Sequence, residues 1–219
     1  MISTFNFLVQ HRSEIYSLTL DHLFLVGVSI LLAFSIGLPL GILVTRKPRL
    51  QEWVLGSTNI VQTIPSLALF GFLLPAPWLG ARADRIAITA LTLYALLPII
   101  RNTFVGITGV DPALREAAIG MGLTDWQLLY QLELPLASSV IPSGLRVATV
   151  TGVGVATIAA AIGAGGLGEL IFRGVATVDN SLILSGAVPA ALLALTADIG
   201  LGLIESWLRP PGPTPTLTP

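Results

Sequence analysis

The amino-acid sequence predicts an all-α integral membrane protein with five transmembrane helices and a cytoplasmic helical hairpin. Of its 219 residues, 53% are hydrophobic and 11% are charged, whereas soluble domains usually carry about 25% charged residues. The mean hydropathy is +0.85. Five apolar stretches are each long enough to cross the ~30 Å hydrocarbon core of a bilayer. So little charge cannot cover a globular surface, and we therefore expect a surface that faces lipid.

Composition also excludes several kinds of chemistry. The chain has no cysteine, which excludes disulfides and thiolate metal sites. Its net charge of −1 gives no reason to expect nucleic acid as a partner. The two histidines, His11 and His22, both lie near the N-terminus, so neither a histidine-based metal cluster nor a Ser-His-Asp triad is expected. We therefore predict no metal site and no catalytic residue.

Three segments follow from the distribution of apolar residues. Residues 1–20 are weakly amphipathic and are expected to form a short interfacial segment. No basic region precedes an apolar core there, so a cleaved signal peptide is not expected. A membrane domain should occupy residues 21–209, and the Pro/Thr-rich tail 210–219 should be disordered. Within the membrane domain the predicted spans are 23–44, 53–74, 86–107, 138–161 and 182–207.

The basic residues predict how the spans are oriented. Arg46, Lys47 and Arg49 directly follow the first span, and such a cluster marks a cytoplasmic loop. The N-terminus is then outside, and five spans put the C-terminus in the cytoplasm. With this orientation seven Lys and Arg residues lie on or near the inner side and four lie outside.

Polar residues interrupt the second predicted span. Gln62, Thr63, Pro65 and Ser66 would be costly in contact with lipid, so they should face protein or a wet cavity. Pro65 should also kink the helix. These residues are compatible with two roles: they can form contacts between helices, or they can line a path across the membrane. Together with Tyr94 of the third span, they are our candidates for such a path.

A ridge of small residues runs along the fourth predicted span. Ala148, Gly152, Ala156 and Ala160 recur at every fourth position. Small residues at this spacing let two helix backbones approach closely. The ridge is therefore expected to pack against a second membrane chain.

One acidic residue, Asp198, lies within the fifth predicted span. An acid at that depth is a candidate functional group, for example a proton site. The alternative, which we favour, is an ion pair or hydrogen bond with a neighbour such as Arg146 or Arg101.

The glycine-rich stretch 163–168 matches the dinucleotide-binding pattern G-x-G-x-x-G. That pattern needs a strand before it and a helix after it, and here it follows a membrane helix. We therefore interpret it as an outer turn, followed by a loop over residues 169–181.

The segment 111–135 has the sequence signals of two short helices joined at a glycine. Asp111 can cap a helix that begins at Pro112, where a missing N–H has no cost. Gly122 suits the left-handed position after that helix. Thr124 and Gln127 have the spacing of a capping box. The second helix is expected to stop before Pro135.

This hairpin resembles the EAA loop of ABC import permeases, whose pattern is Glu-Ala-Ala, three residues, Gly, nine residues, Ile, one residue and Leu-Pro. Residues 116–118, Gly122 and 134–135 match that pattern, with Leu132 at the position of the usual Ile. Four segments are similar to glycine betaine/choline/carnitine osmoprotectant permeases, and the similarity covers about residues 20–208. These segments are 62–69, 96–102, 110–114 and 162–168.

The resemblance implies the permease fold of type I ABC importers, in the cell (inner) membrane of a bacterium or archaeon. It implies a second permease chain, identical or related, and a separate extracytoplasmic binding protein. It also implies two ATPase subunits that hold ATP and Mg²⁺, since this chain binds no cofactor and lacks a phosphate-binding G-x-x-x-x-G-K-[ST] stretch. The residues that it implies for coupling to the ATPase are Glu116, Ala117, Ala118, Gly122, Leu134 and Pro135.

The solute implied by the resemblance is a quaternary-ammonium osmoprotectant. An ABC importer of methionine or another small solute is the nearest alternative. An ion-driven secondary transporter that uses Asp198 is a further alternative, but such transporters usually contain an internal repeat, and the sequence shows none.

Overall fold

The computed structural model describes residues 11–80 and 82–208, and these residues form helices and turns without a β-strand. The predictions for residues 1–10 and for the tail 210–219 lie outside the described residues. Four described helices are long and apolar enough to cross a membrane. They are α2 (Arg12–Arg46), α5 (Ala83–Thr108), α9 (Ile141–Ala159) with its continuation to Ile162, and α11 (Asn180–Leu208).

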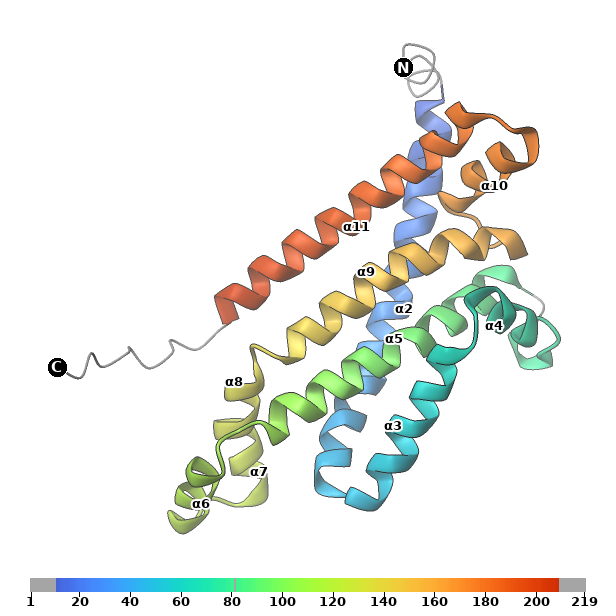
Figure 1. Ribbon diagram of the computed structural model, residues 1–219. Helices are drawn as coiled ribbons and strands as arrows, with labels where there is room; N and C mark the ends of the chain where they lie inside the picture. The colour runs from blue at the N-terminus through green and yellow to red at the C-terminus, as the bar shows by residue number, and fades with distance from the viewer. Residues whose placement is uncertain (1–10, 81, 209–219) are drawn as a thin grey trace.

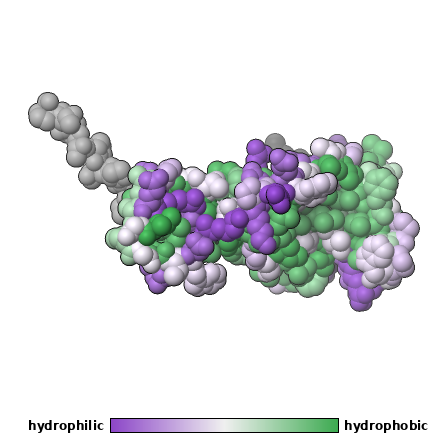
Figure 2. Space-filling view, turned by 90° about the horizontal axis from the view of Figure 1, so that it is seen from below, coloured by the Kyte–Doolittle hydropathy of each residue, from purple (hydrophilic) through white to green (hydrophobic). Residues whose placement is uncertain are grey.

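These four helices pack side by side. In Figure 1, α9 lies between α11 and α5, and α2 crosses behind α9 and α5. α5 packs against both α2 and α9, and α11 packs on α9. The main core cluster joins α2, α5 and α9 through residues such as Leu25, Ile86 and Val153. Seen from below, hydrophilic residues gather over the lower end of the molecule, beside hydrophobic surface (Figure 2). This distribution is typical of a protein whose sides contact lipid.

The first long helix begins before the predicted span. α2 runs without a break over 35 residues from Arg12, so residues 12–20 belong to the same helix as the span. Gly37 and Gly41 of this helix lie in close contact with α5. A Cβ at Gly41 would lie 2.5 Å from Thr103 Cβ, and one at Gly37 would lie 2.9 Å from Ile99 Cγ2.

This contact predicts a stability difference between two glycines of the same helix. Gly41→Ala is expected to destabilise the protein by about 1–3 kcal/mol, because the new methyl group overpacks the contact between α2 and α5. Gly27→Ala is the matched control, since no atom lies within 4 Å of its Cβ position. Thermal unfolding in detergent measures both, and a melting temperature for Gly41→Ala as high as that of Gly27→Ala would contradict the prediction.

The second predicted span is two helices, α3 (Pro48–Thr63) and α4 (Ser66–Leu73), of 16 and 8 residues. Ile64 between them is extended, with φ −71° and ψ 126°. The residue before a proline is driven out of the helical region by the proline ring, so Pro65 breaks the helix where only a kink was expected. The prediction of five continuous spanning helices is therefore replaced by four long helices and one broken segment.

The end of the molecule opposite the hairpin contains a short helix where a loop was expected. α10 (Gly168–Thr177) follows the glycine-rich turn and packs against α11. Gly163, Gly165 and Gly166 all have φ near +80°, at 79°, 86° and 82°. These backbone conformations explain the glycines as a tight turn. No strand precedes them among the described residues, so the turn lacks the βαβ context of a dinucleotide site.

The hairpin forms at the lower end of Figure 1, from α6 (Pro112–Gly120) and α7 (Asp125–Leu128). Its predicted caps are confirmed. The Asp111 carboxylate accepts a hydrogen bond of 2.8 Å from the N–H of Ala113, and Gly122 has φ +87°. The side chains of Thr124 and Gln127 form the complete capping box.

The predicted stop before Pro135 is wrong. A π-helical turn, Leu129–Glu133, leads directly into α8 (Leu134–Ala137), so the backbone stays helical through the proline. Proline has no N–H to donate to the carbonyl four residues earlier and crowds that carbonyl. The wider π turn removes this conflict by changing the hydrogen-bond spacing just before the proline.

Candidate functional site

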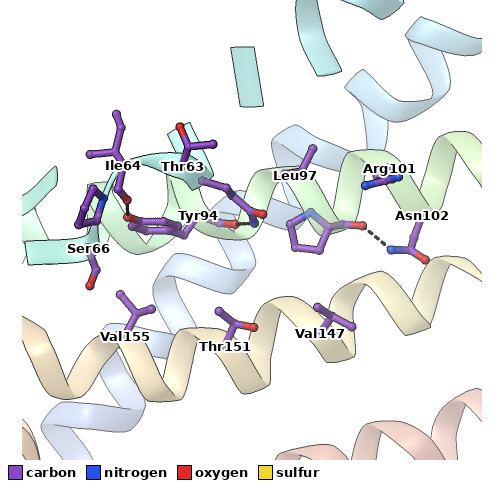
Figure 3. Close-up of a pocket in the computed structure, with 13 residues that line it drawn as sticks. Thr63, Ile64, Ser66, Tyr94, Leu97, Arg101, Asn102, Val147, Thr151 and Val155 are labelled. Atoms are coloured by element: carbon purple, nitrogen blue, oxygen red, sulfur yellow. Dashed lines mark hydrogen bonds between the residues drawn. The ribbon is translucent and has the colours of Figure 1, made fainter. Parts of the chain in front are cut away.

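A pocket of about 550 Å³ lies where the break between α3 and α4 faces α5 and α9 (Figure 3). It brings together all five residues predicted for a path across the membrane: Gln62, Thr63, Pro65, Ser66 and Tyr94. Sequence analysis missed the rest of its lining. The other lining residues are Ile64, Leu97, Pro98, Arg101, Asn102, Val147, Thr151 and Val155. The lining residues that belong to α5 follow Tyr94 at spacings of three and four residues, which place side chains on one face of a helix. This spacing was the signal in the sequence that could have identified them.

Two prolines create the polar chemistry of this pocket. Pro98 has no N–H, so the carbonyl of Tyr94, four residues earlier, loses its helical partner. The Gln62 side-chain amide donates to that carbonyl at 2.9 Å. In return the Tyr94 hydroxyl donates to the carbonyl of Ile64, at the break caused by Pro65. Gln62 and Tyr94 therefore join α3 to α5 and also line the pocket, while their place on a path across the membrane stays a prediction.

The ridge of small residues packs inside the chain. Ala148, Gly152 and Ala156 are buried, and a Cβ at Gly152 would meet Val26 and Ile30 of α2 at 3.8 Å. Ala160 is partly buried and approaches α10, since a Cβ at Gly168 would lie 2.8 Å from Ala160 Cβ. The expectation that this ridge faces a second chain is therefore wrong for its buried members. Small residues permit close packing, but the sequence does not say with which helix.

Asp198 forms the ion pair that was favoured for it. Arg146 Nε and Nη2 donate to the two Asp198 carboxylate oxygens at 2.6 and 2.8 Å. Glu205 lies on the other side of the same guanidinium, with its Oε2 3.7 Å from Arg146 Nη1. This bidentate geometry links α9 to α11 and gives Asp198 a structural partner. No group of three or more His, Asp or Glu residues that could hold a metal occurs in 11–80 and 82–208.

The residues predicted to couple to an ATPase divide between two faces of the hairpin. Glu116, Ala117, Gly122 and Pro135 are exposed. Ala118 is buried, and the half-buried Leu134 packs on the cluster of Ile107 and Leu129. The structure thus presents four of the six to the outside and uses two to hold the hairpin against the long helices.

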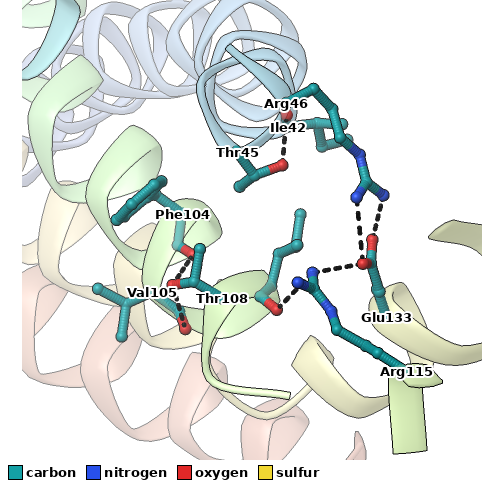
Figure 4. A network of polar contacts seen from close by, with 9 residues as sticks. Ile42, Thr45, Arg46, Phe104, Val105, Thr108, Arg115 and Glu133 are labelled. Carbon is teal, nitrogen blue, oxygen red and sulfur yellow. Dashed lines mark hydrogen bonds and ion pairs between the residues drawn. The ribbon is translucent and has the colours of Figure 1, made fainter. Parts of the chain in front are cut away.

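An ionic network at the base of the hairpin was not predicted. The Glu133 carboxylate, which is 0% exposed, accepts hydrogen bonds from Arg46 at the end of α2 and from Arg115 of α6 (Figure 4). Arg115 also donates to the carbonyl of Ile107 in α5 at 3.4 Å. One buried carboxylate therefore ties the hairpin to two long helices. The sequence signal that could have indicated this network is Glu133 itself, an acidic residue between Leu132 and Leu134 on an otherwise apolar face.

Comparison with known proteins agrees with this architecture. The model of the family "Binding-protein-dependent transport system inner membrane component" matches residues 37–210. The chain is 44% identical over 192 residues to the carnitine transport permease protein OpuCB of Listeria monocytogenes, covering 88% of this chain and 87% of that protein. It is 47% identical over 189 residues to the glycine betaine/carnitine/choline transport system permease protein OpuCD of Bacillus subtilis, covering 85% and 81%.

Solved structures show the same fold. An inward-facing structure of the MetNI methionine ABC transporter superposes with a TM-score of 0.78 at 26% identity, covering 87% of this chain and 94% of that chain. The family match and the curated relatives confirm a transport subunit of the predicted family, and these relatives are permeases and not enzymes. The chain therefore belongs to the family of binding-protein-dependent transport system inner membrane components, as a permease subunit of an ABC importer.

Proposed function

We propose that this chain forms one wall of the translocation path of an ATP-driven importer for glycine betaine, choline, carnitine or a similar quaternary-ammonium solute. The observation that carries the proposal is the convergence of Gln62, Thr63, Pro65, Ser66 and Tyr94 on one pocket beside the helix break. The names of relatives that are 44–47% identical supply the class of solute. A wet, partly aromatic wall between long apolar helices is suited to a small polar solute.

The proposed assembly adds three kinds of subunit. A second permease chain, identical or related, covers the open side of the pocket. Two ATPase subunits, which bind ATP and Mg²⁺, contact the exposed hairpin residues Glu116, Ala117, Gly122 and Pro135. A separate binding protein delivers the solute at the opposite end, near α10. ATP-driven closure of the ATPase pair then moves the hairpin, and with it the ends of α2 and α5.

The proposed orientation puts the hairpin and the C-terminus in the cytoplasm and the N-terminus outside, in the cell membrane. Arg46, Lys47 and Arg49 lie at the hairpin end of α2, in agreement with the preference for basic residues on the inner side. The hydrophilic residues seen over that end support the same arrangement (Figure 2).

Uptake by the reconstituted complex tests this proposal. The chain is co-purified with its ATPase and placed in proteoliposomes with its binding protein. Radiolabelled glycine betaine is expected to accumulate only when ATP, the ATPase and the binding protein are all present. Uptake without the ATPase would contradict the proposal and would favour an ion-driven transporter. In that case Asp198→Asn would abolish proton coupling.

Methionine is the second candidate solute, because the MetNI transporter has the same fold at 26% identity. Thermal-shift measurements on the cognate binding protein with glycine betaine, choline, carnitine and methionine discriminate between the two candidates. Stabilisation by methionine alone would replace the proposed solute class and leave the proposed subunit role unchanged.

A further inference from the structure

The pocket beside the helix break carries a single formal charge, that of Arg101. Its described lining residues include no Asp or Glu. Arg101 is exposed and has no hydrogen bond or ion pair within residues 11–80 and 82–208. Arg146, which also lies within a long helix, is paired with Asp198. An unneutralised guanidinium in a polar pocket presents planar N–H donors that match a carboxylate.

Three other polar side chains of the pocket each hold a backbone carbonyl. Asn102 Nδ2 donates to the carbonyl of Pro98 at 2.8 Å, and Gln62 Nε2 donates to that of Tyr94, which Pro98 leaves without its helical partner. The Tyr94 hydroxyl donates to the carbonyl of Ile64 at the helix break. Of the described lining residues, Arg101 alone carries a charge, so it offers the strongest interaction with an anionic group in this pocket.

Tyr94 and Arg101 lie on nearly the same face of α5. They are seven positions apart, which is about two helical turns and roughly 10 Å along the axis. Both line the pocket, and Figure 3 shows them along the same wall. A quaternary ammonium group is attracted to the face of an aromatic ring, which completes a site for both ends of a small zwitterion.

We propose that this pocket binds a zwitterionic solute with its carboxylate at Arg101 and its quaternary ammonium group toward Tyr94. The permease itself then prefers carboxylate-bearing solutes to a cation with the same ammonium group and no carboxylate. This inference rests on the proposed function, since it takes the pocket to lie on the translocation path.

Equilibrium binding to the purified complex, without its binding protein, tests the preference. The complex is placed in lipid nanodiscs and titrated with radiolabelled glycine betaine and choline, which share a trimethylammonium group and differ in the carboxylate. Glycine betaine is expected to bind about 10- to 100-fold more tightly, the range of a charge-assisted hydrogen bond. Arg101→Gln is expected to remove this advantage and to leave choline binding unchanged within about twofold.

Two further variants sharpen the result. Arg101→Lys keeps the charge without the planar fork and should retain part of the preference. Arg85→Gln, at an exposed position near the start of the same helix, is the matched control and should bind like the unmodified complex. If Arg101→Gln does not assemble, Arg101→Lys decides, because an unchanged full preference in that variant contradicts recognition by the guanidinium.

Several outcomes would overturn the inference: equal affinity for the two solutes, no binding of either, or an equal loss of both in Arg101→Gln. Uptake by the same unmodified complex separates these outcomes from failure of the proposed function. ATP-dependent uptake without an Arg101-dependent preference contradicts only the assignment of the carboxylate site.

Discussion

Glu133→Ala is expected to lower the free energy of unfolding by about 3 kcal/mol and to uncouple ATP hydrolysis from uptake. Its carboxylate is fully buried and forms ion pairs with both Arg46 and Arg115. Removing one member of a buried charge pair typically costs about 3–5 kcal/mol. The lower value applies here, because the arginine side chains are 33% and 28% exposed and water can solvate them after the change.

The uncoupling follows from the position of this network. Glu133 joins the hairpin to α2 through Arg46, and Arg115 continues the connection to the Ile107 carbonyl of α5. Without the carboxylate, two like charges remain next to each other at the base of the hairpin. Under the proposed assembly, a hairpin held loosely transmits less of the motion of the ATPase, so more ATP is expected to be hydrolysed for each solute imported.

Unfolding in detergent and the ratio of ATP hydrolysed to solute imported measure the two effects. Glu116→Ala is the matched control for stability, since this exposed glutamate on the same hairpin should change the unfolding free energy by at most ~0.5 kcal/mol. Arg115→Ala should cost much less in the Glu133→Ala background than alone, because the partners form one network. Additive losses would show that Glu133 and Arg115 do not act together.

Gly122→Asp is expected to leave the chain folded in the membrane and to abolish uptake. Gly122 adopts φ +87°, and no atom lies within 4 Å of its Cβ position, so the chain itself has room for a side chain. The local cost is backbone strain of roughly 1–2 kcal/mol. Under the proposed assembly this exposed turn presses against the ATPase, where a new side chain and a negative charge separate the two surfaces.

Gly163→Asp is a close control for this prediction. Gly163 has φ +79°, is exposed, and also has no atom within 4 Å of its Cβ position, but it lies in the turn at the opposite end of the molecule. Both variants carry the same strain and the same charge. Co-purification of the ATPase should fall by at least about tenfold for Gly122→Asp, the effect of ~1.4 kcal/mol, and should be unchanged for Gly163→Asp. Equal retention by both variants would contradict the coupling role of the turn.

Local signals in the sequence were sufficient for the hairpin caps and for the four long helices. Asp111, Gly122 and the capping box of Thr124 act within one or two turns of backbone, so their residue types and spacing carry the whole effect. The polar pocket residues at the helix break were also found, because polar groups inside an apolar segment are costly in lipid, whereas Arg101, Asn102 and Thr151 were missed. The severity of the break at Pro65 and the π turn before Pro135 were missed, since each depends on backbone adjustments that residue types alone do not specify.

The sequence by itself determined an α-helical membrane chain, the local geometry of its hairpin and five residues that come together in one pocket. Only the tertiary structure decided which groups are partners. It turned the ridge of Ala148 and Gly152 inward, paired Asp198 with Arg146, and buried Glu133 between two arginines 87 and 18 residues away along the chain. The physical reason is that apolarity and helix caps act over a few residues. The choice of a packing partner or a counter-ion depends instead on contacts between helices distant in sequence.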